Sequence, residues 1–586
     1  MSTTTATDAV VLAPEAVTVA ASFDWSMTPR YEDSWKAWGY VFPDGQIGYD
    51  PSFVHPSRYQ VELDACTSNG GGQAIDEYRW TLRQDGEPLD TATSRTCLLL
   101  NSEDRPDSER LDFPAEGRYL VDLQILTSGG ITARQTREVI VNDVLIVSIG
   151  DSSASGEGNP PFVFNRCHRG KTSGHSMAAQ LVEDADPRTS VTFLSYACSG
   201  ARLDVGLMRP YDGIEDTEGP ELPPQVEQVF RGVCSVDPGD CNASDQRTVD
   251  HLLVAIGVND IHFSEVLLGC MFDADCHRSA ALEELIATGL SHIENRDPLT
   301  DTSVSDLVDQ LNTYHGVGIP VLRRYLTEYP DNPFGSPSGE PSRGCGLTRG
   351  VKTPEAAWLH DQAVILNRAL EAESVRRDFT YVGGIAERFS NRGYCASDTY
   401  FVAINQSFLN QGDKSGAMHP TRAGHTAIAE QVVDAMHSQL PAAPATHVTL
   451  RIESLRVHPI NANAGGTTNG GSKFTDGLIG TRFVAQGAET HDGFSLDSAT
   501  RVFENRIQPD VFVPLPAELM TFEFDVPAGD GLVVVGGVTG GVARETHQIS
   551  PVLSDHQFEM SGSSDTLQFD VRYRITTEPI LVATSR

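Results

Sequence analysis

A serine that could act as a nucleophile follows an apolar run in the first third of the chain. Residues 144–149 read Val-Leu-Ile-Val-Ser-Ile, and a Gly-Asp-Ser triplet that ends at Ser152 comes directly after them. A buried strand that breaks at a glycine and presents a serine is how an α/β sheet displays a nucleophile at its carboxyl edge. A serine hydroxyl also needs an imidazole to accept its proton. His419, which stands before Pro420 and a predicted helix, is the candidate base.

Two further segments could supply the donors that stabilise an oxyanion. Gly200 lies in a Cys-Ser-Gly-Ala segment, and without a Cβ its N–H can approach a reacting carbonyl closely. Asn259 lies in a Gly-Val-Asn-Asp segment, which by itself is also typical of an Asx turn at the end of a strand. With the N–H of Ser152 they form a candidate oxyanion hole.

The four segments together resemble the sequence blocks of the SGNH/GDSL hydrolase family over roughly residues 144–440. The resemblance is closest to a disulfide-rich branch of secreted bacterial esterases similar to those of Streptomyces. It implies a flavodoxin-like three-layer α/β/α domain that hydrolyses esters through an acyl-serine intermediate. The residues that carry the chemistry in that family fall here on Ser152, Gly200, Asn259 and His419.

One position departs from the family pattern. The family commonly places an aspartate three residues before the catalytic histidine, and here that position is Gly416. In the esterase branch that the chain resembles, a main-chain carbonyl at this position orients the imidazole. The carbonyl of Gly416 is therefore the first candidate and Asp413 the second. A carbonyl can accept from Nδ1–H, but it stabilises an imidazolium less than a carboxylate does.

A second serine, Ser176, lies in a Gly-His-Ser-Met-Ala segment that resembles the nucleophile elbow of α/β-hydrolases. That elbow requires a strand directly before it, and none is predicted here. Ser173 is instead a good N-cap for a following helix. Ser176 is therefore not the expected nucleophile, and His425 is expected to pack or cap within the last helix.

Ten cysteines in an acidic chain indicate an oxidising compartment. The alternative is a zinc site at Cys270, Cys276 and His277, but Cys-x5-Cys lacks the tight spacing of structural zinc sites. No phosphate-binding loop or nucleotide fingerprint is present, so neither a metal nor an organic cofactor is expected. Read in order, and with support from the resemblance for the last four, the cysteines suggest the pairs Cys66–Cys97, Cys167–Cys198, Cys234–Cys241, Cys270–Cys276 and Cys345–Cys395.

The composition excludes several classes of protein. At 586 residues, with 39% hydrophobic and 21% charged residues, the chain is expected to form two to four globular domains. A net charge of −37 without a basic run argues against binding to nucleic acid or anionic membranes. The sequence contains no apolar run of eighteen residues, so no transmembrane span is predicted. The first residues lack a basic n-region, so we expect the mature form of a secreted protein, without its leader.

The hydrophobic patterning divides the chain into three parts. Residues 1–143 alternate apolar and polar side chains between turn signals, which predicts an immunoglobulin-like or polycystic-kidney-type β-sandwich. Residues 144–440 alternate strands with helices, for example at 354–376 and 423–440, as in a parallel sheet. After a Pro/Ala-rich linker, residues 446–586 predict a second β-sandwich.

The sequence therefore predicts a secreted three-domain serine esterase or lipase that hydrolyses acyl lipid esters. An O-acetyl esterase acting on polysaccharides is an alternative, because flanking sandwiches favour a glycan or surface substrate. A non-catalytic surface adhesin with a relic hydrolase core is a third. Family membership alone does not choose among ester substrates.

Overall fold

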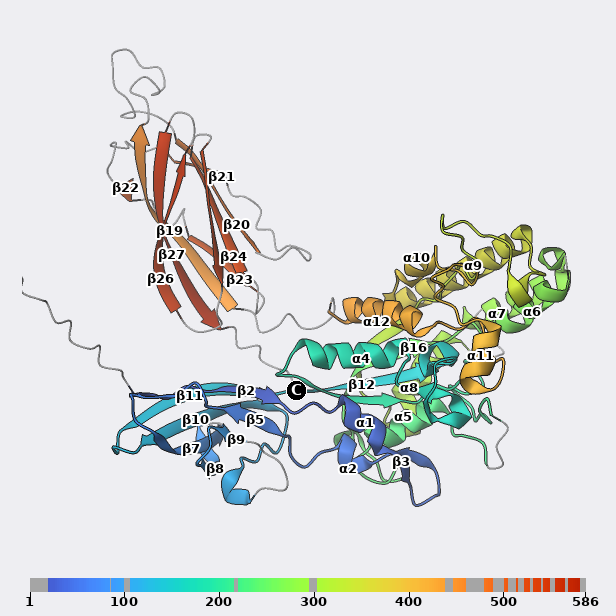
Figure 1. Cartoon of the computed structure of the whole chain (residues 1–586), viewed down its shortest axis with the longest axis horizontal. Helices are drawn as coiled ribbons and strands as arrows, with labels where there is room; N and C mark the ends of the chain where they lie inside the picture. The colour runs from blue at the N-terminus through green and yellow to red at the C-terminus, as the bar shows by residue number, and fades with distance from the viewer. Residues whose placement is uncertain are drawn as a thin grey trace, which may run out of the picture. The chain divides into compact units, whose positions relative to one another are not determined.

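The computed structural model describes residues 19–437, apart from 85, 100–105, 216–219, 274 and 295–302, and the strands between residues 446 and 579. The chain divides into two compact units, residues 1–438 and 439–586 (Figure 1). Among the described residues, no helix combines the length and hydropathy needed to cross a bilayer.

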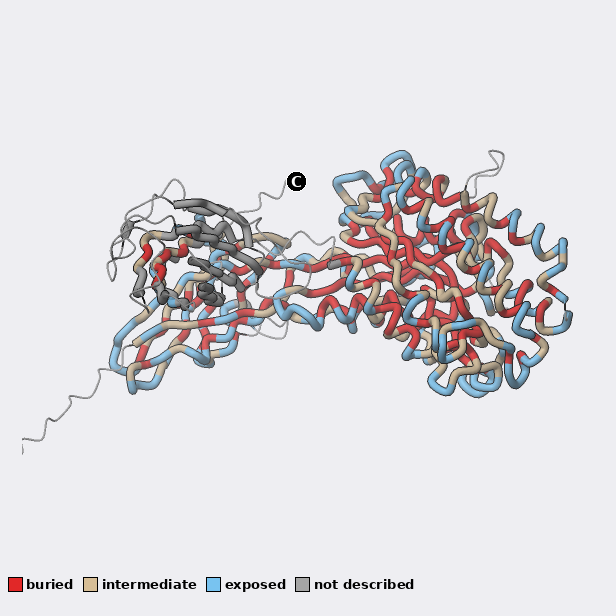
Figure 2. The backbone as a smooth tube through the Cα atoms, turned by 90° about the horizontal axis from the view of Figure 1, so that it is seen from above, coloured by how far each residue is buried: buried red, intermediate tan, exposed pale blue. Residues whose placement is uncertain are grey.

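A five-stranded parallel sheet forms the centre of the first unit. Its order is β15 (Ser190–Ser195), β12 (Asp143–Gly150), β16 (Val249–Ala255), β17 (Val321–Thr327) and β18 (Thr380–Val382). Every residue of β12 and β15 is buried, as Figure 2 shows in red. This burial explains the continuous apolar run, because helices cover both faces of such a sheet.

Helices flank the sheet on both faces. Figure 1 shows α4 (Gly174–Ala185) and α12 (Arg422–His437) above it, and α5 (Gln225–Val233) and α8 (Val304–Thr313) below it. Helix α9 (Thr353–Arg376) packs on β17 and β18. The mixed α/β class with a parallel sheet and the helix expected at 354–376 are therefore confirmed. The helix expected at 423–440 is confirmed as far as His437, and residues 438–440 lie outside the described residues.

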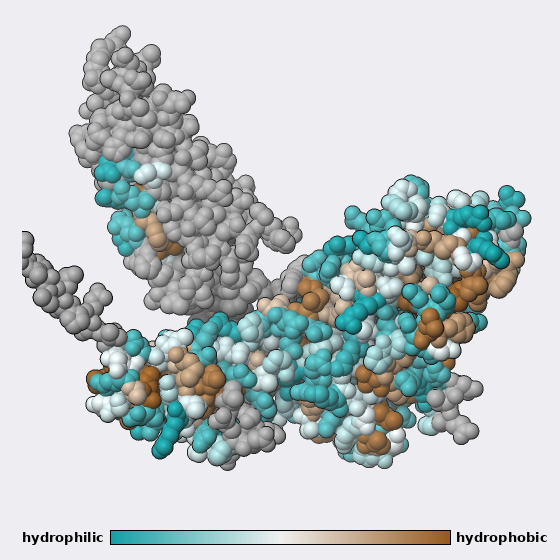
Figure 3. Space-filling model, viewed as in Figure 1, coloured by the Kyte–Doolittle hydropathy of each residue, from teal (hydrophilic) through white to brown (hydrophobic). Residues whose placement is uncertain are grey.

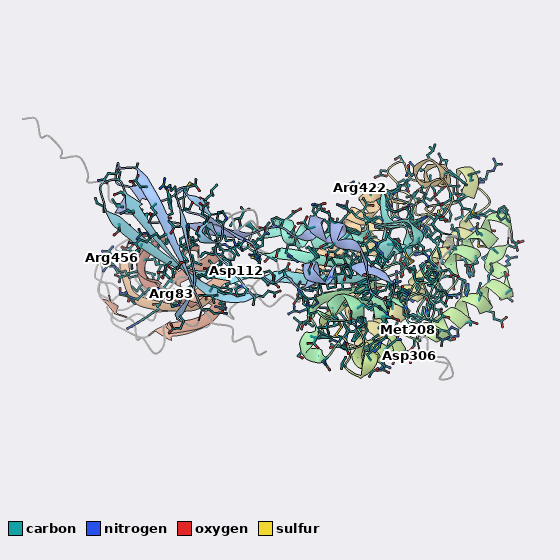
Figure 4. All side chains as sticks on the ribbon, turned by 90° about the horizontal axis from the view of Figure 1, so that it is seen from below. Arg83, Asp112, Met208, Asp306, Arg422 and Arg456 are labelled. Carbon is teal, nitrogen blue, oxygen red and sulfur yellow. A yellow bond between two sulfur atoms is a disulfide. The ribbon has the colours of Figure 1, made fainter. Side chains whose placement is uncertain are left out.

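Helix α8 also contacts the loop that follows Gly200 and Ala201. Gln310 of this helix donates to the carbonyl of Met208 at 3.4 Å. At the start of α8, the carboxylate of Asp306 (labelled in Figure 4) completes the capping box.

The strand order reverses on either side of β12, since the chain passes first to β15 and then to β16. Ligands of open α/β sheets bind at the carboxyl ends of the strands at such a switch point. Three segments meet there: α3 (Ser152–Ser155) after β12, the loop 196–200 after β15 and the loop 256–260 after β16.

The N-terminal part contains two antiparallel sheets around a shared apolar core. One sheet has the order β11 (Thr132–Val141), β10 (Gly117–Thr127), β7 (Ile75–Gln84) and β8 (Glu87–Ser94), and the other β2 (Asp24–Met27), β5 (Val61–Asp64) and β9 (Leu98–Leu99). Trp80 on β7 and Leu63 on β5 are fully buried in that core. The face seen in Figure 3 is mostly hydrophilic with scattered apolar side chains, which is ordinary for a protein surface.

One segment of this part belongs to the α/β core and not to the N-terminal sheets. Helix α1 (Tyr31–Ala37), the hairpin of β3 (Trp38–Val41) and β4 (Ile47–Tyr49), and helix α2 (Pro51–Val54) pack beside β15. The residues before 143 thus contribute to both cores, and the predicted domain boundaries stay a prediction.

This segment covers the outer edge of β15. Ser34 Oγ accepts from the N–H of Phe193 at 2.9 Å, and Tyr49 Oη accepts from the N–H of Ser195 at 2.8 Å. Glu183 accepts from the N–H of Val191 at 2.9 Å. Side chains thus satisfy alternate donors that an edge strand would otherwise leave unpaired.

The second unit consists of antiparallel strands. Its order is β21 (Thr500–Phe503), β20 (Ile479–Gly487), β24 (Gly531–Val538), β25 (Gly541–Gln548), β26 (Ser554–Ser563), β27 (Leu567–Pro579), β19 (Thr446–Pro459) and β22 (Val513–Pro514), and β23 (Thr521–Val526) also pairs with β19. On β19, Arg456 (labelled in Figure 4) contacts Asp570 at 2.7 Å. The described strands thus agree with the β-rich pattern, and the sandwich stays a prediction.

Candidate active site

Ser152 and His419 meet at the carboxyl edge of the sheet. Nε2 of His419 lies 2.7 Å from Oγ of Ser152, although the two residues are 267 positions apart. This is the distance at which an imidazole can accept the serine proton.

The turn before Ser152 requires a glycine. Gly150 has a φ of +139°, and a Cβ there would lie 2.1 Å from the carbonyl oxygen of Ala255 on the neighbouring strand. The N–H of Asp151 donates to that same oxygen at 2.9 Å. Asp151 then caps α3, since its carboxylate accepts from the N–H of Ser153 at 2.9 Å. Ser152 is therefore held at the first position of a helix.

Backbone hydrogen bonds hold the loop that carries His419. The carbonyl of His419 accepts from Val402, and the N–H of Met418 donates to Val402 at 2.9 Å. Met418 has a φ of +67°, which is uncommon for a residue with a side chain. Burial lowers the pKa of His419, so that the ring is neutral, as a base must be, at neutral pH.

The Nδ1 atom of His419 is buried and faces the backbone of residues 415–417. The carbonyls of Ala417, Gly416 and Ser415 lie near enough to favour the protonated ring, but Nδ1 makes no hydrogen bond with the described residues. The carbonyl of Gly416 also accepts from the N–H of His419 itself at 3.3 Å.

Asp413 is directed elsewhere. Its carboxylate accepts from Gln411 Nε2 at 2.9 Å and from the N–H of Ser415 at 2.6 Å, and neither bond goes to His419. The geometry thus favours backbone carbonyls over Asp413 as the groups next to Nδ1.

Two backbone donors at the site have no acceptor within the described part of the chain. They are the N–H groups of Ser152, at the start of α3, and Gly200. Gly200 has a φ of +83°, and Cys198 beside it is bonded to Cys167. Nδ2 of Asn259 donates to the carbonyl of Ala201 at 3.0 Å, which orients its amide. The structure therefore brings all three expected donors to one edge of the sheet.

A buried acid pair behind the nucleophile was not predicted from the sequence. Tyr329 donates to Asp151 Oδ2 at 2.5 Å, and Asp260 accepts from the N–H of Leu203 at 3.0 Å. Burial raises the pKa of Asp151 to about 7 and that of Asp260 to about 7. No spacing in the sequence points to Tyr329, which lies 178 positions from Asp151.

The second serine motif lies apart from this chemistry. Ser176 is buried within α4, and its hydroxyl is 2.7 Å from that of Tyr31. His425 is also buried, and its Nδ1 accepts from the N–H of Gly174 at 3.1 Å. Both residues therefore join α4 to neighbouring elements.

Every cysteine forms a disulfide with its neighbour in sequence order. Cys270 and Cys276 are therefore not free thiolates that could bind zinc. The bonds are Cys66–Cys97, Cys167–Cys198, Cys234–Cys241, Cys270–Cys276 and Cys345–Cys395.

Family models and curated proteins give no match to this chain. Among solved structures, an extracellular lipase from Streptomyces rimosus is similar at 18% identity and a TM-score of 0.34, over 50% of this chain and 99% of the lipase. An acetyl xylan esterase from Geobacillus stearothermophilus is similar at 15% identity and a TM-score of 0.25, over 50% of this chain and 96% of the esterase. A putative GDSL-like lipase from Parabacteroides merdae shows 13% identity and a TM-score of 0.22, over 50% and 96% of the two chains.

Proposed function

We propose that the chain is a secreted serine ester hydrolase whose acyl-enzyme forms on Ser152. The hydrogen bond of 2.7 Å between Ser152 Oγ and His419 Nε2, at the switch point of the sheet, is the observation that carries this proposal. Five disulfides support an oxidising, extracellular location.

In the first half of the reaction, His419 takes the Oγ proton as Ser152 attacks the ester carbonyl. The N–H groups of Ser152 and Gly200 and the amide of Asn259 then donate to the oxyanion. When the tetrahedral intermediate collapses, the carbon–oxygen bond to the alcohol breaks and His419 returns the proton to the leaving alcohol. Water, deprotonated by His419, releases the acid in the same way.

The substrate class that we propose is the acyl lipid ester. The alternatives are an O-acetyl group on a polysaccharide, with the flanking β domains binding the glycan, and a surface adhesin without activity. Turnover of p-nitrophenyl esters from acetate to palmitate distinguishes them. A preference for long chains supports a lipase, and a preference for acetate supports a deacetylase.

The control variants test the nucleophile. Ser152→Ala is expected to abolish turnover and labelling by a fluorophosphonate, whereas Ser176→Ala is expected to keep both. A folded wild-type protein that neither turns over any ester nor reacts with the fluorophosphonate would favour the adhesin.

A further inference from the structure

Glu157 is a buried carboxylate whose partners come from three parts of the active site. It is 1% exposed. His168 Nδ1 lies 2.8 Å from its Oε2, and the Ser199 hydroxyl donates to the same oxygen at 2.5 Å. Gln411 Nε2 donates to its Oε1 at 2.7 Å. His168 follows the disulfide residue Cys167, Ser199 precedes Gly200, and Gln411 ends the helix before the His419 loop.

The backbone around Glu157 contacts the catalytic residues directly. The N–H of Glu157 donates to the carbonyl of Ser152 at 3.2 Å. Gly158 packs so tightly on the next loop that a Cβ there would lie 2.9 Å from the carbonyl oxygen of Gly416. Asn159 Nδ2 donates to the carbonyl of Pro420 at 2.8 Å. The segment 157–159 therefore contacts the His419 loop on both sides of the histidine.

The charges in this cluster leave an excess of negative charge near His419. Burial raises the pKa of Glu157, but the hydrogen bond from His168 and the positive charges of His168 and of the protonated His419 ring outweigh it and hold the pKa at about 2. The second nitrogen of His168 lies 2.7 Å from Glu215. Asp413 is the third carboxylate of the cluster.

Among the described residues, His425 is a second titratable group that interacts electrostatically with His419. Burial lowers the pKa of His425 to about 3, so it is neutral. Burial also lowers the pKa of His419, and the charge of Glu157 acts in the opposite direction.

We propose that Glu157 is a positioning residue that takes over the task of the acid missing at residue 416. Its carboxylate stabilises the His419 imidazolium by its charge, and its hydrogen bonds tie the nucleophile, oxyanion and histidine loops together. This inference rests on the proposed function, because it assigns Glu157 a role in that same reaction. It differs from a triad acid, since Glu157 makes no hydrogen bond to His419.

The test compares Glu157→Gln with Glu157→Asp, which keeps the charge, and with Glu183→Gln. Glu183 is a matched control, because it is a buried carboxylate of the same domain that accepts backbone N–H groups of Arg30, Tyr31 and Val191. Two readouts follow each variant: kcat and KM for p-nitrophenyl acetate across pH, and the pKa of the His419 ring by NMR titration, assigned with His419→Gln.

In Glu157→Gln we expect the apparent pKa of the acidic limb of the kcat/KM profile to fall by roughly 1 pH unit, because a nearby negative charge is lost. The pKa of the His419 ring should fall by the same amount. We expect kcat to fall roughly 10- to 100-fold while KM changes less than about threefold. In Glu157→Asp the apparent pKa of the acidic limb should stay near the wild-type value, because the charge is kept. Glu183→Gln should leave both readouts unchanged.

An unchanged ring pKa in a folded Glu157→Gln protein would overturn the inference, as would an equal shift in Glu183→Gln. If Glu157→Gln does not fold, the shift in Glu157→Asp decides: a ring pKa near the wild-type value with lowered kcat supports the inference, and a fall of a full unit overturns it. If the wild-type protein hydrolyses no ester, the proposed function fails, and the NMR titration still decides whether Glu157 sets the protonation of His419.

Discussion

Replacing Gly200 by alanine is expected to disable the oxyanion hole without unfolding the protein. Gly200 has a φ of +83°, and a Cβ there would lie 2.3 Å from the hydroxyl oxygen of Tyr211. That hydroxyl donates to the carbonyl of Ser199 at 2.9 Å, so it cannot move without disturbing the same loop.

The expected size follows from these two effects. The left-handed backbone costs an alanine roughly 1–2 kcal/mol of stability. To restore ordinary contact between the added Cβ and the Tyr211 hydroxyl oxygen, the backbone at residue 200 must move by about 1 Å. This movement takes the N–H of residue 200 out of hydrogen-bond range of the oxyanion. Losing one such donor lowers kcat on the order of 100- to 1,000-fold.

The assay is the steady-state hydrolysis of p-nitrophenyl acetate together with thermal unfolding. Gly45→Ala is the matched control, because Gly45 has a φ of +85° and no atom lies within 4 Å of its added Cβ. It should lose similar stability and keep full kcat. In Tyr211→Phe/Gly200→Ala the nearest ring carbon is 3.5 Å away, so part of the lost kcat should return.

Two results would refute this reasoning. A folded Gly200→Ala protein with wild-type kcat would show that the Gly200 N–H does not bind the oxyanion. A loss of kcat that the Tyr211→Phe background does not relieve would show that backbone strain, and not the clash, displaces the donor.

Three further changes test other parts of the site. Asp413→Ala is expected to keep more than about a tenth of kcat, and a fall of about 1,000-fold would make Asp413 the acid of the triad. Because burial raises the pKa of Asp260 to about 7, the stability that its protonated form provides is lost as pH rises from about 4 through 7. In Asp260→Asn the midpoint of urea unfolding should therefore change less with pH than in the wild-type protein. An equal dependence on pH in the two proteins would contradict this. Tyr49→Phe should cost about 1–3 kcal/mol in urea unfolding by leaving the Ser195 N–H unpaired, whereas the exposed Tyr40→Phe should change little.

The central sheet and the meeting of nucleophile and base could be predicted because both leave a pattern in the sequence. A strand buried on both faces reads as a continuous apolar run, as β12 does. The segments of Ser152, Gly200 and Asn259 each follow a strand of the parallel sheet, which brings its carboxyl ends to one edge. His419 follows no strand, and the family resemblance, with Pro420 and a helix after it, pointed to it. Ser152 and His419 were therefore expected at one site before the contact between them was seen.

The polar contacts behind the site could not be predicted in the same way. Tyr329, in the loop after β17, reaches Asp151 across 178 positions, and Gln411, at the end of α11, reaches Glu157 across 254 positions. Such a long-range hydrogen bond depends on where the whole fold places its two residues. The pairing of Asp413 with Gln411, and not with His419, is decided at that level.

Residues 31–54 pack against the α/β core, which no pattern in their sequence predicts, and they contact the strand that leads to Gly200. The guanidinium of Arg169 is fully buried and donates to the carbonyls of Tyr196 and Ala197 at 3.0 and 2.9 Å. Burial lowers its pKa only to about 10, so it stays charged. Trp38 of the N-terminal segment lies over this cation at 4.6 Å.

A buried cation is costly unless polar groups and aromatic faces surround it. Trp38 therefore helps to keep Arg169 on the two carbonyls that lead into Gly200. Tyr49 of the same segment also accepts a hydrogen bond from Ser195 on β15, the strand that leads to Gly200. Residues outside the four sequence blocks therefore stabilise this strand. A chain that began at residue 144 would lose both supports, and its oxyanion loop would no longer be fixed in place before substrate binds.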